Sequence, residues 1–134
     1  MLELNSIEER VVEKLLEGAD PTLFALRQQF ATLSFAGRRG SGIGFFVTFA
    51  SGTTTEPLPG SPNFELGDVM AKSDKLPRDA GFILFVRNGL IESLEGYAFE
   101  GAWPSEIENF FLEYSNDRRN DLSALDQISP RKQY

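Results

Sequence analysis

Apolar residues recur at helical intervals over the first part of the chain. Ser6 and Glu9 have the spacing of a capping box, and Gly18 can close the helix that such a box would open. Asp20 and Pro21 then have the order of an N-cap and a first helical residue. The apolar positions of the two segments are Ile7, Val11, Leu15 and Leu16, and then Leu23, Leu26, Phe30 and Leu33. This pattern predicts two helices joined by a short connection.

After these helices the pattern becomes that of β-strands. Residues 34–39 are expected to be extended, residues 43–50 form a strand rich in Phe, Val and Thr, and residues 63–72 form a weaker strand in which Gly67 marks a bulge. Residues 81–86 are apolar almost throughout, which indicates a strand covered on both faces. Asn88 and Gly89 suit a type I′ turn, because both positions need positive φ, and residues 90–99 return as the partner strand.

The last apolar pattern lies just before a polar C-terminal stretch. Pro104 can open a short helix whose apolar side is formed by Ile107, Phe110, Phe111 and Tyr114. Residues 115–134 are expected to form a polar, mobile tail behind a single domain of residues 1–114. The order of elements predicts an α+β domain. It has an antiparallel or mixed sheet of four or five strands, two N-terminal helices and one short C-terminal helix.

Composition excludes most common catalytic sites. The 134 residues include neither histidine nor cysteine, which removes Ser-His-Asp and Cys-His sites and His- or Cys-ligated metals. Glu92 and Glu95 are three residues apart on an expected strand, which sends them to opposite faces. Glu65 and Asp68 fail the same test unless there is a bulge, and a pairing of Glu65 with Glu92 across neighbouring strands stays open. The sequence therefore predicts no catalytic residue, no metal and no cofactor.

A glycine-rich stretch, residues 37–44, contains Arg38 and Arg39 and so has residues that can bind an anion. A phosphate-binding loop needs Gly-Lys-Ser/Thr, and a dinucleotide fingerprint needs a helix after its glycines. Here a strand follows. The stretch is better explained as a turn, in which Gly42 and Gly44 allow close packing beside the following strand.

The charge balance bears on partners and location. Twenty acidic and 13 basic residues give a formal charge of −7. That charge argues against a nucleic-acid partner and suits either simple solubility or a basic protein partner. The chain start lacks the basic-then-apolar order of a signal peptide, and no stretch has the roughly 18–20 apolar residues that span a bilayer. We therefore expect a cytoplasmic protein without a membrane partner.

Aromatic residues are abundant for so small a chain, at 12%. Neighbouring aromatic residues on a strand point to opposite faces, and helices can cover only one of them. The second face then needs loop cover or serves as a patch for a partner or for self-association. Trp103 is the preferred contact residue, because Trp is enriched in interface hot spots. The acids Glu92, Glu95 and Glu100 complete the surface expected to meet a basic partner.

Several short motifs carry a resemblance to a known family. They are Gly42-Ile43-Gly44-Phe45-Phe46, Leu58-Pro59-Gly60, Gly67-Asp68-Val69, Gly81-Phe82-Ile83-Leu84-Phe85-Val86, Gly89, Leu94-Glu95-Gly96-Tyr97 and Trp103-Pro104. With these motifs the chain, from about Ile7 to Phe111, resembles a family of small uncharacterised bacterial proteins. The resemblance implies no catalytic residue, because that family has no established activity. In size, acidity and lack of catalytic groups, the chain is also similar to immunity proteins that neutralise bacterial toxins.

These observations favour a non-catalytic protein-binding module over an enzyme. Its sharpest form is an immunity protein that neutralises a basic, toxin-like partner. The alternatives are a small hydrolase or lyase that uses carboxylates alone, and a homodimeric structural protein that pairs sheets through aromatic faces.

Overall fold

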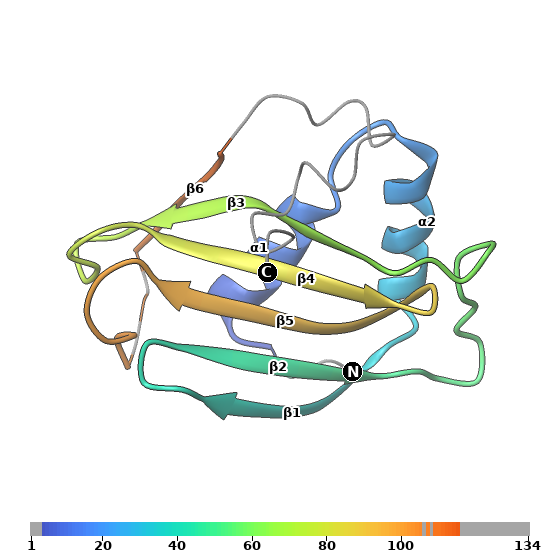
Figure 1. Ribbon diagram of the computed structural model, residues 1–134, viewed down its shortest axis with the longest axis horizontal. Coiled ribbons are helices and arrows are strands. Elements are labelled where there is room, and N and C mark those ends of the chain that lie inside the picture. Colours follow the sequence, from blue (N-terminus) through green and yellow to red (C-terminus); the bar gives the residue numbers. More distant parts are fainter. Residues whose placement is uncertain (1–3, 106, 108, 116–134) are drawn as a thin grey trace.

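The computed structural model describes residues 4–105, 107 and 109–115 as two helices followed by six strands (Figure 1). The helices are α1 (Ser6–Leu15) and α2 (Pro21–Phe30). The strands are β1 (Ser34–Gly40), β2 (Gly44–Ala50), β3 (Phe64–Lys72), β4 (Ala80–Arg87), β5 (Leu90–Ala98) and β6 (Phe111–Tyr114). They form one sheet in the order β1-β2-β5-β4-β3-β6, with every neighbouring pair antiparallel. The α+β class and the two N-terminal helices are therefore confirmed.

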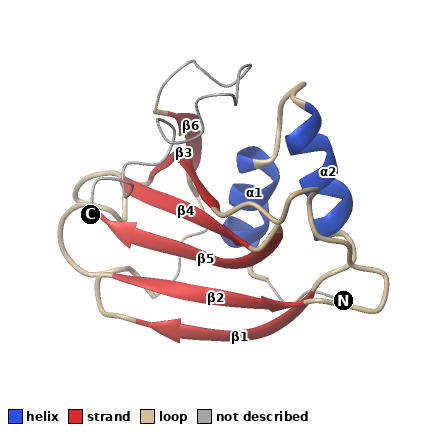
Figure 2. Ribbon diagram, turned by 45° about the vertical axis from the view of Figure 1, so that its right-hand side comes forward, coloured by secondary structure: helices blue, strands red, loops and turns tan. Residues whose placement is uncertain are grey.

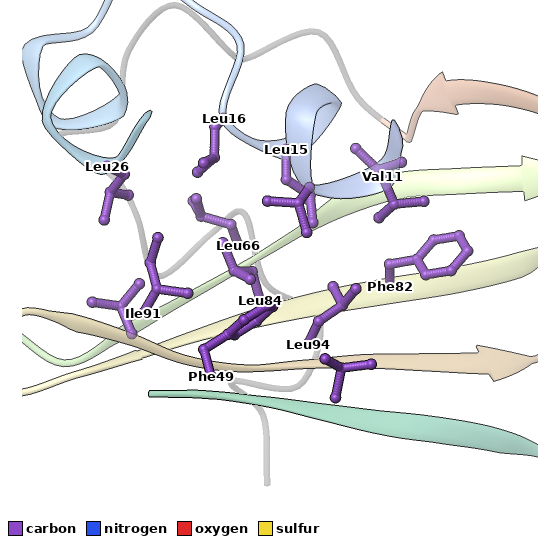
Figure 3. Packing of buried hydrophobic residues seen from close by; sticks show 14 of the residues in the cluster. Val11, Leu15, Leu16, Leu26, Phe49, Leu66, Phe82, Leu84, Ile91 and Leu94 are labelled. Atoms are coloured by element: carbon purple, nitrogen blue, oxygen red, sulfur yellow. The ribbon is translucent and has the colours of Figure 1, made fainter. Parts of the chain in front are cut away.

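Both helices lie on the same side of the sheet (Figure 2). The buried face of the sheet is built around a cross-strand row in which Val47 pairs with Leu94, Leu94 with Leu84, and Leu84 with Leu66. All four side chains are fully buried. The buried apolar residues of the helices and the cap residue Leu16 point toward this row, as Figure 3 shows for Val11, Leu15, Leu16 and Leu26. The core is thus one layer between two helices and one sheet face.

The caps of the helices follow local side-chain chemistry. Asn5 is the N-cap of α1: its side chain accepts a hydrogen bond from the amide of Glu8, whose carboxylate accepts one from the amide of Asn5. The capping box therefore lies one residue before the predicted pair Ser6 and Glu9. The N-cap of α2 is Asp20, as predicted, with its carboxylate 2.8 Å from the amide of Thr22. Neither described helix is long and apolar enough to cross a membrane.

The predicted hairpin and bulge are both present. Asn88 and Gly89 join β4 to β5 with φ of 55° and 76°, as a type I′ turn requires. The register of β3 against β4 shifts between Leu66 and Val69, which places the bulge at Gly67 and the following residue. A second shift lies opposite Glu92 on β5.

The C-terminal part of the fold differs from the prediction. The sheet has six strands, and residues 111–114 form β6 on the edge of β3 where a short helix had been expected. The described part of residues 104–115 contains no helix. Leu112 and Tyr114 pack toward the core and the Tyr114 hydroxyl donates to the carbonyl of Lys14, while Phe111 is 63% exposed. This alternation has the period of two that a strand requires. The expected mobile tail lies outside the described residues, except for Ser115.

Candidate protein-binding surface

The sheet has a second face, which points away from the helices. Along a strand, successive side chains alternate between faces, so the neighbours of the core row point outward. The residues placed there by the strand register are Arg39, Phe46, Thr48, Glu65, Met70, Lys72, Gly81, Ile83, Phe85, Ser93, Glu95, Tyr97, Phe111 and Glu113. We call this set, together with Phe99, the outer face. Figures 1 and 2 show the helices on the opposite side.

Several aromatic side chains lie on the outer face. Phe46, Phe85 and Tyr97 are half-buried, and Phe99 is 39% exposed. The rings of Tyr97 and Phe99 are in contact, with centroids 5.6 Å apart. Ile83 lies among them and is fully buried although it belongs to the face opposite the helices. The outer face therefore holds apolar side chains among polar and charged ones, separate from the single core layer.

A glycine allows the aromatic pair to lie across the sheet. Gly81 pairs with Tyr97 across the β4–β5 ladder. A Cβ atom at this position would lie 2.7 Å from Cζ and Oη of Tyr97 and 3.1 Å from Cε1 of Phe99. Both rings therefore occupy the space that any larger residue than glycine would fill. Placing an aromatic ring over a facing glycine is a known way of stabilising a sheet.

Arginine side chains cover two of the rings. The guanidinium of Arg39 lies 5.5 Å from the ring centroid of Phe46, and that of Arg87 lies 5.1 Å from that of Phe85. Arg87 also forms an ion pair with Glu65 at 3.2 Å. These contacts are cation–π geometries that shield an aromatic ring and keep a charged group at the surface.

The β3–β6 margin of the outer face carries a small charge network. The ammonium of Lys72 lies 3.5 Å from a carboxylate oxygen of Asp79 and 3.6 Å from one of Glu113. Asp79, and then Glu113, raise the pKa of Lys72 above its ordinary value of 10.5. This lysine is therefore already engaged by acids of the chain itself.

The four predicted contact residues do not lie together. Glu95 lies in the middle of the outer face, between its cross-strand partners Phe46 and Ile83. Glu92 is exposed near the start of β5, and Glu100 is exposed beyond its end. Glu95 is thus the one acid of the three that the register sets among the aromatic rings.

Trp103 packs mainly with the core. It is half-buried, and its ring makes edge-to-face contacts with Phe45 and Phe82 at centroid distances of 5.0 and 6.0 Å. Its amide donates to the carbonyl of Gly42 at 2.9 Å. Phe45 crosses Gly96, where an added Cβ would lie 2.3 Å from the ring. The tryptophan therefore closes the end of the core on the side of the helices.

The glycine-rich stretch forms the end of β1, a turn and the start of β2. Gly44 approaches β5 so closely that a Cβ there would lie 1.9 Å from the carbonyl oxygen of Gly96, which confirms the predicted close packing at this residue. At Gly42 the prediction is wrong, because an added Cβ would meet nothing within 4 Å; this glycine instead has a φ of 85° in the turn. Arg38 donates from Nε to the carboxylate of Glu8 at 2.9 Å. A cavity of about 330 Å³ lies beside this pair and Trp103. The anion that meets Arg38 is thus a buried glutamate of α1.

The carboxylate pairing that the sequence left open is not formed. Glu65 lies on β3 and Glu92 on β5, and β4 separates the two strands. Within the residues that the structure describes, no group of three or more acidic side chains is placed to hold a metal ion.

The sequence shows that aromatic residues are abundant, but its pattern alone does not identify Phe46, Phe85, Tyr97 and Phe99 as a set. The usable signal was Phe45-Phe46, because two neighbouring residues of a strand point to opposite faces and only one of these rings can lie in the core.

Comparisons of the chain with protein-family models, curated proteins and solved structures find no match. The resemblance to a bacterial family stays a prediction, and function is argued from the geometry of the outer face.

Proposed function

We propose that this protein is a non-catalytic, cytoplasmic protein-binding module that holds a basic protein partner against its outer face. The observation that carries the proposal is the set of partly exposed rings, Phe46, Phe85, Tyr97 and Phe99, on a sheet face that neither α1 nor α2 covers. Aromatic residues in a contiguous patch are typical of protein interfaces and of their hot spots.

The size of the patch matters for this proposal. Fully removing one Phe or Tyr side chain from water contributes about 1.5–3 kcal/mol. Association costs about 4–15 kcal/mol in lost translational and rotational freedom. One ring cannot offset that cost, so a partner must cover several rings at once. These four rings come from β2, β4, β5 and the residue that follows β5, and their spread favours a broad protein surface over a small ligand.

Charge indicates the kind of partner. The chain carries a formal charge of −7, so long-range attraction favours a basic protein. The basic residues of the outer face and its margin are engaged: Arg87 with Glu65, Lys72 with Asp79, and Arg39 on the ring of Phe46. In its sharpest form, the proposal is an immunity protein that neutralises a basic toxin by occluding its surface.

A pair of photo-cross-linking variants tests the proposal. A photoreactive phenylalanine derivative replaces Phe99 on the outer face or, as a matched control, Phe24, which is 54% exposed on α2. We expect position 99 to cross-link a basic protein in cells of the native host and position 24 not to. Identical products at both positions, or none at position 99, would refute the proposal. A cross-link solely to a second copy would replace it with the homodimer.

The immunity form needs a separate functional readout. If the cross-linked protein is toxic when produced alone, co-expression with this chain should restore growth. Double replacement of Phe46 and Tyr97 by Ser should abolish the rescue. Growth that the double variant restores as well as the wild type would show that protection does not use the outer face.

A further inference from the structure

One residue of the outer face is buried more deeply than the strands beside it explain. Ile83 is fully buried, yet among the described residues the hydrophobic cluster beneath the helices does not include it. Side chains stand roughly perpendicular to a sheet, so neighbours within the sheet shield their flanks and leave their outer ends open. Two residues before Ile83 is Gly81, which has no side chain, and both helices lie on the other side of the sheet (Figure 2). Ile83 therefore requires a cover that neither α1 nor α2 supplies.

We infer that the C-terminal segment, residues 116–134, lies over the outer face with its apolar side chains against Ile83. The described chain reaches Ser115, whose amide donates to the carbonyl of Asp68 at 2.8 Å. Asp68 belongs to the β3 bulge, and the register places this bulge opposite Ile83. The segment therefore begins about two strand spacings, or about 10 Å, from the residue that it covers. Its 19 residues span up to about 60 Å when extended, so length does not limit it.

The C-terminal segment has the side chains that such a cover requires. Leu122, Leu125 and Ile128 recur at intervals of three residues in a stretch that is otherwise largely polar. The segment carries four basic and three acidic residues, whereas residues 1–115 carry nine basic and 17 acidic ones. Opposite net charges favour the docking of the segment on the rest of the chain, and the three apolar side chains can remove Ile83 from water.

The segment makes the outer face a regulated surface, a consequence that rests on the proposed function. A partner must displace the segment, so the affinity that it shows depends on how often the face is open. A face that is open about a tenth of the time lowers the apparent affinity about tenfold. Phe99 and Phe111 are 39% and 63% exposed. At the margin of the face they offer a first contact for a partner while the centre is still covered.

Spin labelling of the full chain tests the inference without any partner. Because the chain contains no cysteine, one introduced cysteine carries the only nitroxide. The label is attached at Ser123→Cys in the segment or, as a matched control, at Gln28→Cys, which is exposed on α2. We expect the label at position 123 to broaden the methyl signals of Ile83 beyond detection and the label at position 28 to broaden them far less. Equal broadening by the two labels, or no broadening from position 123, would overturn the inference.

Two double variants, made in the Ser123→Cys background, test which side chains hold the segment. Leu122→Ser with Leu125→Ser should restore the Ile83 signals, whereas the control Asn120→Ser with Gln127→Ser should not. Signals that stay lost in the leucine variant contradict the apolar contact. If the signals of an isotope-labelled copy are lost only when a second, spin-labelled copy is added, the face binds the segment of another molecule and the intramolecular cover is wrong.

The same double variants without a label separate this inference from the proposed function. The leucine variant should bind the partner cross-linked at position 99 about tenfold more tightly than wild type, and the polar variant should bind it as wild type does. Equal affinity of all three proteins would remove the competition between segment and partner. A host without any such partner would remove the proposed function and leave the spin-label result standing.

Discussion

The side-chain amide of Gln29 connects α2 to the β4–β5 turn, and its removal gives a sharp test of the fold. Gln29 is 4% exposed. Its Nε2 donates to the carbonyl oxygens of Glu56 and Gly89, both at 2.9 Å, and its Oε1 accepts from the amide of Ile91 at 2.7 Å. The substitution Gln29→Leu keeps the size of the side chain and removes all three hydrogen bonds.

The loss of unfolding free energy in Gln29→Leu depends on which buried groups are left without any hydrogen-bond partner. The carbonyl of Gly89 also accepts from the amide of Leu58 at 2.9 Å, so it stays satisfied. The buried amide of Ile91 loses the bond that Gln29 supplied, whereas Glu56 is exposed and its carbonyl can bind water instead. A buried group left without its partner costs about 1–3 kcal/mol, and the added apolar burial returns up to about 2 kcal/mol. We expect a net loss of about 1–2 kcal/mol, roughly 5 °C in Tm.

Urea unfolding followed by tryptophan fluorescence measures this loss, and Gln28→Leu is the matched control. Gln28 is the exposed neighbour on the same helix. Its replacement should change the free energy of unfolding by less than about 0.5 kcal/mol. Hydrogen exchange adds a local readout, because the amide of Ile91 should exchange faster only in Gln29→Leu. Equal unfolding free energies for the two variants would show that the amide does not hold α2 to the turn.

Three further predictions concern the sheet. Gly89→Val should lower Tm strongly, because φ is +76° there and a Cβ would lie 2.8 Å from the Leu58 amide nitrogen; an unchanged Tm would refute the turn. Gly96→Ala should destabilise the protein by about 1–3 kcal/mol and shift the emission of its single tryptophan to the red, because the new methyl meets the ring of Phe45; unchanged emission would contradict this packing. Lys72 should keep its charge, and with it its ion pairs, up to pH 10.5 and should lose them as pH rises through its higher folded pKa. In alkaline urea titrations the wild type should therefore lose the contribution of these ion pairs to the free energy of unfolding, whereas Lys72→Met has no such contribution to lose.

Local chemistry was enough to predict some elements. The Asn88-Gly89 turn and the Asp20 cap follow from the conformations that these residues favour, whatever lies around them. The cap of α1 shows where such reasoning stops. Asn5 with Glu8 and Ser6 with Glu9 are both spaced as a capping box, and the sequence cannot rank them. The tertiary structure selects Asn5 with Glu8, because Glu8 is 1% exposed and forms an ion pair with Arg38 on β1.

The C-terminal strand depended on distant contacts. Ile107, Phe110, Phe111 and Tyr114 have helical spacing, which explains the wrong prediction. The pairing of Lys72 with Phe111 and of Val69 with Tyr114 gives this segment its strand conformation. Both partners lie far upstream on β3, so no window of the local sequence contains the deciding information.

The candidate site was predictable in kind but not in position. Trp103 was selected for its residue type, and its surroundings come from β2 and β4, which sequence spacing could not bring together. The sequence sent Glu92 and Glu95 to opposite faces but could not say which of them lies among the aromatic rings. The register of β5 distinguishes them, because it sets Glu95 between Phe46 and Ile83 while Glu92 lies at a bulge.

The position of β5 has a consequence for how the chain is made. Because β5 lies between β2 and β4, a nascent chain that has not reached Ala98 can form the β1–β2 and β3–β4 hairpins but cannot join them. Each hairpin then exposes an unpaired strand edge beside apolar side chains such as Val47 and Leu84, a combination prone to aggregation. Synthesis of β5 therefore separates this aggregation-prone intermediate from a sheet in which both hairpins are joined and only β6 is still missing.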